Sequence, residues 1–222
     1  LMPAQTVAGV KALSLFVMGL IPIAIGFLVP FSHLLAEAYK RFQYAGFSND
    51  LLQAAINTVT LSSIATLVTL ISGFLIVSAA RFSKNTLFSR ISSLGYAIPG
   101  TVLAIGLLLS LGVIDHALAD FLEFKLGISA GLIFLGTSFT LIYAYTIRFM
   151  AISIGGTESG YNRINSVLDD AGRNLGQTKL GILWHVHCPL LRPAIISAAL
   201  LIFVDYMKEL HATLLLKPLN SE

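Results

Sequence analysis

Four long stretches of the chain contain no Asp, Glu, Lys or Arg, and they comprise residues 12–32, 51–80, 91–114 and 126–147. A helix needs about 20 residues to cross roughly 30 Å of hydrocarbon, and each stretch is that long. In lipid every backbone polar group must be paired within the protein, which leaves helices as the natural form for apolar stretches of this length. The four stretches therefore predict an all-α membrane protein.

The composition agrees with this class. Only 11% of the 222 residues are charged, against about a quarter in soluble domains, and 56% are hydrophobic. The mean hydropathy is +0.84. A soluble domain would need a polar exterior, which so few charges cannot supply. We therefore expect lipid to surround most of the chain, and the net charge of +3 gives no signal for nucleic acid.

A fifth apolar segment begins near Pro189 or Pro193 and ends at about Met207, and Arg192 and Asp205 shorten its uncharged length. We predict one transmembrane domain over residues 1–222, with spans at about 12–32, 54–80, 92–114, 128–148 and 189–207. Gly127 and Gly131 are four residues apart at the start of the fourth span, a spacing that allows two helices to pack closely.

The first stretch has a second interpretation as a secretory signal, because Lys11 precedes it and "AEA" at residues 36–38 resembles a cleavage site. Its length and its two prolines, Pro22 and Pro30, favour a retained helix.

Basic residues predict the orientation of the spans. With five alternating spans, one side receives nine Lys and Arg residues and the other receives five. The richer side holds Lys11, Arg81, Lys84, Arg90, Arg148, Arg163, Arg173, Lys179 and Arg192. Because cytoplasmic loops carry the excess of Lys and Arg, this side is predicted to be cytoplasmic. The loops at residues 31–50 and 115–125 then face outwards.

The longest segment between spans, at about residues 152–188, has a helical pattern of its own. Ser166 and Asp169 resemble a capping arrangement that opens a helix over "VLDDAGRNL". Gly176 then breaks this helix, and "TKLGILWHVHCP" restarts a second one that Pro189 ends or redirects. Ala171 and Gly172 leave a flat patch that another protein can approach. A simple amphipathic connector between two spans explains the same residues about as well.

The stretch from Asp169 to Pro189 resembles the coupling motif of binding-protein-dependent ABC importer permeases, which reads Glu-Ala-Ala, three residues, Gly, nine residues, Ile-x-Leu-Pro. The spacing matches at every step, with Asp for Glu, Gly for the second Ala, Val for Ile and Cys for Leu. The matching positions are Asp170, Ala171, Gly172, Gly176, Val186, Cys188 and Pro189.

Other segments extend the resemblance to about residues 10–218. "NTVTLSSIATLVTLISGFLIVSAAR" from Asn57 and "YAIPGTVLAIGLLL" from Tyr96 resemble two further spans of the family. "FVDYMKELHATLLLKP", residues 203–218, resembles the end of the second half of fused iron(III) transport permeases, which usually have proline where this chain has His211.

This resemblance implies a type I ABC importer permease core whose sixth helix is missing from this chain, with a first permease half fused upstream. The chain begins at Leu1 without Met and stops at Glu222 soon after "KPL". We therefore expect it to be a fragment of a larger permease.

The resemblance also implies partners and a location. An ABC ATPase dimer would hold ATP and magnesium and dock on the coupling motif, a periplasmic protein would deliver the substrate, and the chain would lie in the bacterial inner membrane with its coupling loop in the cytoplasm. The docking residues would be Asp169, Asp170, Ala171, Gly172, Leu175, Gly176, Val186 and Pro189. The chain itself would bind no cofactor and would be no enzyme: "GGTESG" at 155–160 has phosphate-loop glycine spacing, but Tyr161 and Asn162 follow it instead of Lys and Ser or Thr.

A few polar residues are candidates for a translocation path or gate. Asp205, Lys208 and Glu209 are three or four residues apart and share one helical face. A charge at the bilayer centre costs about 2.5–3.5 kcal/mol, so these groups either pair at the interface or face a water-lined passage. Asn57 either bonds a neighbouring helix or lines the same passage.

His185, His187 and Cys188 do not predict a metal site. Residues two apart on a helix point in nearly opposite directions, so this sequence has poor ligand geometry. The resemblance places iron ligands on the external binding protein.

Two other classes of function stay open. A secondary transporter or channel subunit would use Asp205, Lys208 and Glu209 as an ion relay, and the coupling motif argues against it. An intramembrane enzyme would need convergent catalytic groups, and the spans contain no Ser/His pair and no HExxH. Among ABC permeases, thiamine, sulfate and polyamines are alternatives to iron(III) as cargo.

Overall fold

The computed structural model describes residues 9–46, 48–83, 85–127, 131–209 and 215–216. Of these residues, 87% are helical and none lies in a strand. Five helices are long and apolar enough to cross a membrane: Val10–Tyr44, Asn49–Ser83, Gly100–Lys125, Ser138–Tyr161 and Lys179–Lys208. The prediction of an all-α membrane protein with five spans is confirmed.

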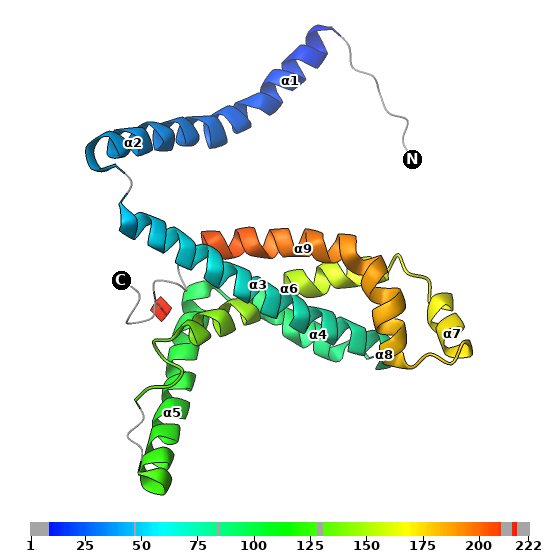
Figure 1. Cartoon of the computed structure of the whole chain (residues 1–222). Helices are drawn as coiled ribbons and strands as arrows, with labels where there is room; N and C mark the ends of the chain where they lie inside the picture. The colour runs from blue at the N-terminus through cyan, green and yellow to red at the C-terminus, as the bar shows by residue number, and fades with distance from the viewer. Residues whose placement is uncertain (1–8, 47, 84, 128–130, 210–214, 217–222) are drawn as a thin grey trace. The chain divides into compact units, whose positions relative to one another are not determined.

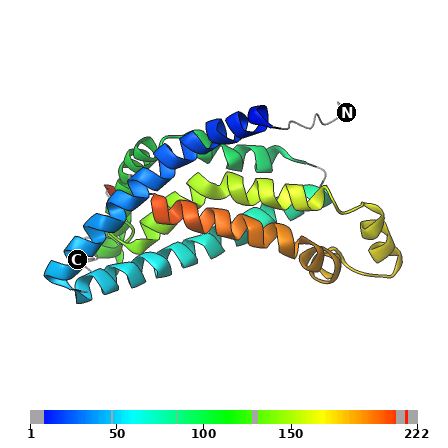
Figure 2. The same cartoon turned by 90° about the horizontal axis from the view of Figure 1, so that it is seen from above.

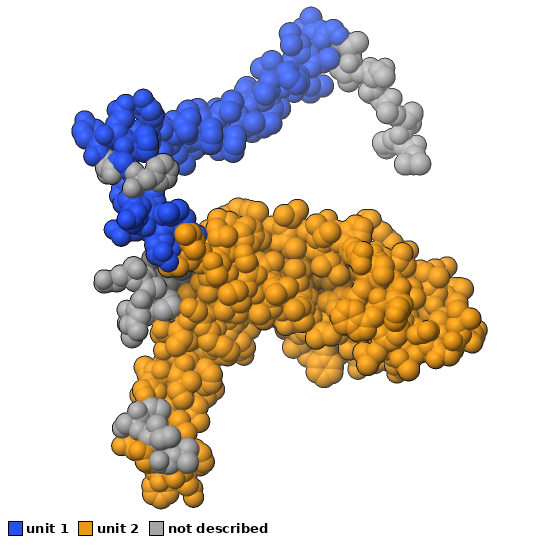
Figure 3. All heavy atoms as spheres, viewed as in Figure 1, with its two compact units in different colours: residues 1–55 blue, residues 56–222 orange. Residues whose placement is uncertain are grey.

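The chain divides into two compact units, residues 1–55 and 56–222, and Figure 3 colours them separately. The first unit contains α1 (Val10–Ile23), a π-helical turn η1 (Ala24–Leu28) and α2 (Val29–Ala45). Large apolar side chains are exposed along both helices, as expected of a lipid-facing segment. The boundary between the units falls inside α3 (Asn49–Ser83).

The second unit contains the remaining helices (Figure 1). After α3 come α4 (Leu87–Ser92), the 3-10 turn η2 (Ser93–Ala97), α5 (Gly100–Leu126) and α6 (Ser138–Tyr161). Then follow α7 (Val167–Asn174), α8 (Lys179–Ile182), the π-helical turn η3 (Leu183–His187) and α9 (Cys188–Lys208). Figures 1 and 2 both show α6 and α9 side by side, with α7 at one end of the unit.

The helices are longer than the expected spans: the first continues to Tyr44, through most of the outward loop expected at 31–50, and the fifth begins at Lys179 rather than at 189. The third and fourth spans also begin later than expected. The helix of the third span, α5, begins at Gly100 rather than near residue 92. Pro99 is its N-cap, and the chain before Pro99 forms α4 and η2. The helix of the fourth span, α6, begins at Ser138 rather than near residue 128. The preceding helix α5 continues to Leu126, where the positive φ of Gly127 ends it. The outward loop expected at residues 115–125 is therefore helical. Charge-free stretches report where hydrocarbon lies, and they do not mark where a helix ends.

Each π-helical turn is followed by a proline. Pro30 follows η1 and Pro189 follows η3, with one residue between in each case. A proline ring clashes with the carbonyl four residues earlier in a regular helix, and a π-helical turn widens the backbone at that point. Pro189 therefore does not end the helix, and the ribbon changes direction between α8 and α9 (Figure 1). Of the two expected effects of Pro189, redirection is the one observed.

Close packing in the second unit depends on glycines of α6. A Cβ atom added to Gly156 would lie 2.8 Å from the Cβ of Ala198, and one added to Gly160 would lie 2.6 Å from Cδ2 of Leu191. Both contacts are with α9, so the spacing Gly156-x-x-x-Gly160 allows α6 and α9 to approach. The pair expected at Gly127 and Gly131 does not act in this way, because neither residue lies in a helix.

The apolar core gathers around the first half of α6. Leu141, Ala144 and Tyr145 are buried there against residues of α3, α5 and α9, including Ala65, Ala104 and Ile202. Tyr206 of α9 stacks on Tyr145 with ring centroids 4.9 Å apart, and its hydroxyl is hydrogen-bonded to Thr69 of α3. This core joins four helices. A second apolar cluster, which includes Val77, Ile154 and Leu191, lies towards the other end of α6.

Candidate coupling site and charged residues of the spans

The segment after α6 forms a helix, a glycine turn and a second helix. Gly176 follows α7 with a φ of +79°, a backbone conformation that glycine adopts without strain. The Thr178 side chain then caps α8, accepting a hydrogen bond from the Gly181 amide at 3.1 Å. The capping role expected of Ser166 and Asp169 is not observed. Instead Asn165 Oδ1 accepts the Val167 amide at 3.0 Å, and Asp169 points elsewhere.

Asp169 belongs to a ring made of four hydrogen bonds and one turn of the α3 backbone. His187 Nε2 lies 2.6 Å from Asp169 Oδ1, and His187 Nδ1 lies 3.1 Å from the Tyr161 hydroxyl. That hydroxyl is 2.9 Å from Ser78 Oγ, and Arg81 Nε closes the ring by donating to Asp169 Oδ2 at 2.9 Å. Ser78 and Arg81 lie one turn apart on α3, so the ring joins α7, η3 and the end of α6 to a single turn of α3.

The ring satisfies all of its hydrogen-bonding groups when His187 is neutral. A carboxylate only accepts, so His187 Nε2–H donates to Asp169 and Nδ1 accepts from Tyr161. The Tyr161 oxygen can then accept from Ser78. His187 is fully buried and Ser78 is 3% exposed, a depth at which an unpaired polar group is costly. The ring is thus a complete buried network that fixes where α7 sits.

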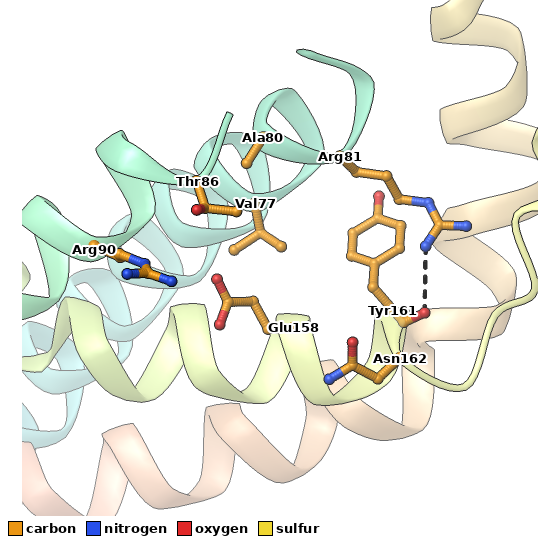
Figure 4. Close-up of a pocket in the computed structure, with 8 residues that line it drawn as sticks. All are labelled: Val77, Ala80, Arg81, Thr86, Arg90, Glu158, Tyr161 and Asn162. Carbon is orange, nitrogen blue, oxygen red and sulfur yellow. Dashed lines mark hydrogen bonds between the residues drawn. The ribbon is translucent and has the colours of Figure 1, made fainter. Parts of the chain in front are cut away.

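Arg81 makes further contacts with the C-terminal end of α6 and the residues that follow it. Its Nη1 and Nη2 atoms donate to the carbonyls of Tyr161 and Ile164 at 3.3 and 3.2 Å. Its guanidinium carbon lies 5.0 Å from the centroid of the Tyr161 ring (Figure 4). Burial raises the pKa of Asp169, but hydrogen bonds from His187 and Arg81 and the charge of Arg81 outweigh it, and the pKa lies below its ordinary 3.8. Asp169 is therefore ionised at neutral pH.

A cleft of about 460 Å³ adjoins the ring (Figure 4). Ser89 of α4 donates to the Glu158 carboxylate at 2.5 Å beside it. Residues of α3, α4, α6 and the segments next to them line the cleft: Val77, Ala80, Arg81, Thr86, Arg90, Glu158, Tyr161 and Asn162.

Gly172 packs against α8 of the same chain. It is buried, and a Cβ atom there would lie 2.8 Å from Cγ1 of Ile182 in α8. The flat patch expected at Ala171 and Gly172 is thus limited to Ala171, which is exposed. The glycine at this motif position serves the packing of α7 on α8.

The outer face of α7 and α8 exposes apolar side chains. Leu175 is 82% exposed and Trp184 is 66% exposed. Together we name these residues the apolar patch: Val167, Leu168, Leu175, Leu180 and Trp184. Asp170 lies beside it with its side chain 69% exposed and 3.6 Å from Arg173. Large exposed apolar side chains close together in the sequence are a feature of protein–protein interaction sites.

The other expected docking residues lie near the same end. Asp170, Ala171, Leu175 and Gly176 are exposed, whereas Asp169 and Gly172 are buried and hold the unit together. Val186 is half-buried in η3, and Pro189 is exposed in the first turn of α9. His185 and His187 diverge as expected, since the exposed His185 bonds the Gly181 carbonyl of its own helical segment.

The expected pathway residues divide into separate contacts. Lys208 Nζ lies 3.5 Å from Asp205 Oδ1 within α9, and both side chains are partly exposed. Glu209 instead pairs with Arg148 of α6, with Nε and Oε2 3.2 Å apart. Asn57 lies on an exposed part of α3. The shared face expected of the three residues is formed by Asp205 and Lys208, whereas Glu209 leaves it because α9 ends at Lys208 and Glu209 has extended backbone.

Sequence reasoning misplaced two charged residues. Arg148 was placed at the cytoplasmic end of the fourth span, but it lies in the middle of α6. Asp115 was assigned to a loop, but it is buried in α5 and accepts backbone amides of Ile133, Phe134 and Leu135 at 2.8–3.1 Å. No local pattern marks either partner. The spacing of Gly156 and Gly160, in contrast, is a signal that could have been read from the sequence.

Comparison with known proteins supports the same family as the coupling motif. No protein-family model matches the chain. It is 26% identical over 174 residues to the Ferric transport system permease protein FbpB of Actinobacillus pleuropneumoniae, covering 77% of this chain. It is also 26% identical over 175 residues, 78% of the chain, to the Fe(3+)-transport system permease protein FbpB 2 of Haemophilus influenzae.

The chain is similar to ferric transport permeases. The similarity agrees with the resemblance found in the sequence. The matches cover 23% and 31% of the two relatives, so the chain spans less than a third of the length of either.

Proposed function

We propose that this chain is part of the transmembrane permease of an ATP-driven ABC importer, which passes ferric iron from a periplasmic binding protein into the cytoplasm. The iron assignment rests on the names of the relatives, which are ferric transport permeases. The mechanism rests on the chain's own geometry. Its five apolar helices provide a multi-pass membrane protein of the kind the relatives represent.

The observation that carries this proposal is that the helical unit with the apolar patch is hydrogen-bonded to the spans through the buried ring. Leu175 and Trp184 are exposed on a short helical unit, while Asp169 on the inner side of α7 is tied to α3 and His187. An ATPase groove that covers the patch would release water from about five apolar side chains. Because the ring links α7 to α3 and α6, movement of the docked ATPase would reach the spans rather than merely bend a loop.

The charge bias supports a cytoplasmic position for α7. Once Arg148 is assigned to the middle of α6, eight basic residues remain on the predicted cytoplasmic side against five on the other. ATP and magnesium belong to the separate ATPase subunit, which is cytoplasmic. The mechanical work of transport would therefore enter this chain through α7 and α8.

The test uses the complete transporter with its ATPase and binding protein. Leu175→Ser removes the most exposed member of the apolar patch, and we expect it to lower both co-purification of the ATPase and uptake of ferric iron by about ten-fold. Gln177→Ser changes an exposed polar residue two positions away and is the matched control. Uptake of thiamine, sulfate or a polyamine in place of iron would reject the cargo. Full ATPase binding by the Leu175→Ser variant would reject the docking role.

A further inference from the structure

An ion pair connects two of the membrane-spanning helices. Arg148, ten residues after the start of α6, lies 3.2 Å from Glu209, which directly follows α9. The Glu209 side chain is 9% exposed and that of Arg148 is 21% exposed. Asp205 and Lys208, which lie four residues and one residue before Glu209, form an ion pair with each other within α9. The Arg148–Glu209 contact therefore adds an ionic link, beyond the end of α9, to the stacking of Tyr206 on Tyr145 that already holds this end of α9 against α6.

The start of α5 forms a third side of this contact. Arg148 Nη1 donates to the Ile98 carbonyl at 3.2 Å, just before Pro99 begins α5. A Cβ atom on Gly100 would lie 2.6 Å from Arg148 Nη1 and 2.7 Å from Glu209 Oε1. Glycine at this position leaves the space that the two charged side chains occupy. Three segments distant in the sequence thus meet at one pair of charges.

The physical properties of the pair suit a contact that opens and closes. Each charge is costly in the hydrocarbon region unless it is paired or reaches water, so each group needs either its partner or water beside it in every state of the transporter. The Nε atom of Arg148 lies 3.2 Å from Oε2 of Glu209, a contact that a small movement of either side chain would break. The partial exposure of Arg148 allows water to reach it on separation.

We propose that Arg148 and Glu209 form a latch that holds α9 against α6 in the resting transporter and opens when the importer changes state. The latch rests on the proposed importer function and adds positioning residues to it. It opens when α9 moves away from α6 and the start of α5, leaving both charges to water in the passage. A resting state held by this contact resists ATP-driven closure until the loaded binding protein supplies the opposing free energy.

Removing the latch should raise the basal activity, an effect that simple loss of structure does not produce. In the complete transporter reconstituted in lipid vesicles, Glu209→Gln keeps the size of the side chain and removes its charge. We expect ATP hydrolysis without binding protein to rise about five-fold or more, because the resting state loses its cross-helix contact. Glu37→Gln is the matched control, since its ion pair with Lys40 stays within α2, and it should leave the basal rate unchanged.

Two further variants complete the test. Arg148→Gln should raise the basal rate of ATP hydrolysis as Glu209→Gln does. It tests the same contact if the Glu209→Gln transporter fails to assemble. The exchange Arg148→Glu with Glu209→Arg restores a pair of opposite charges and should return the basal rate towards that of the wild type. A basal rate unchanged by Glu209→Gln and Arg148→Gln would overturn the latch.

The wild-type transporter tests the underlying function separately. If its ATP hydrolysis is not stimulated by the ferric-loaded binding protein, the proposed importer function fails regardless of any variant. If stimulation is normal and the neutral variants behave as the wild type does, only the latch is rejected.

Discussion

His187 Nε2 lies 2.6 Å from Asp169 Oδ1, and this hydrogen bond joins the turn that leads into α9 to the short helix α7. Eighteen residues separate the two side chains, and both are buried. Arg81 approaches the same carboxylate from α3. One carboxylate thus determines the position of the helix that carries the apolar patch.

Loss of the imidazole should loosen α7. His187→Phe retains a ring that can stack on Phe82 but removes both hydrogen bonds of the histidine. We expect the free energy of unfolding to fall by about 1–3 kcal/mol, because Asp169 and Tyr161 each lose a buried partner. Thermal unfolding of the purified transporter measures this. His185→Phe is the control and should change stability by less than about 0.5 kcal/mol, since His185 is exposed. Equal losses in both variants would show that the ring does not hold α7.

The attachment of α7 should depend on pH only in acid. The pKa of Asp169 is lowered in the folded protein, so its contribution to stability is present above the ordinary value of 3.8 and disappears as the pH falls through the lower, folded value. We therefore expect the α7 amides to keep their protection from hydrogen exchange from pH 7 down to that ordinary value and to lose it below. Asp169→Asn should lack the protection at every pH, while Asp170→Asn, an exposed neighbour, should follow the wild type.

Overpacking between α7 and α8 should be reversible by a second substitution. Gly172→Leu places a side chain where Ile182 already lies, and we expect a loss of about 1–3 kcal/mol in the free energy of unfolding. Ile182→Ala in the same chain should recover part of that loss, because residues in contact do not act additively. Ala171→Leu, at an exposed neighbouring position, is the control. A double mutant that is as unstable as the sum of the two single changes would contradict the contact.

The approach of α6 to α9 depends on one of two adjacent glycines. A Cβ at Gly156 would press on Ala198, whereas nothing lies within 4 Å of a Cβ at Gly155. Gly156→Leu should therefore destabilise the transporter by about 1–3 kcal/mol, and Gly155→Leu should be tolerated in the lipid-embedded protein. Thermal unfolding in detergent compares the two. The same loss at both positions would argue for a general intolerance of leucine in this helix.

Much of the fold was predictable because lipid imposes strict local conditions. A charge-free stretch of some 20 residues has few options in hydrocarbon, and all five predicted spans are present as long apolar helices. Gly176 was equally readable, since a glycine between two helical patterns usually adopts a positive φ, and here φ is +79°. The coupling motif pointed to the same kind of permease as the comparisons with known proteins, because its spacing is independent of the helix boundaries.

What the sequence by itself determined, then, is the all-α membrane class, the five spans, the glycine turn and the relationship to ferric transport permeases. The tertiary structure alone decided which polar groups are partners. Arg148 looked like the end of a span, because a lone charge in hydrocarbon is costly. Its pairing with Glu209 and its hydrogen bond to the Ile98 carbonyl allow it to lie in the middle of α6. Asp169 likewise looked like a cap until His187 and Arg81 were brought to it. Such pairs are set by distances between remote segments, which no local pattern of residues records.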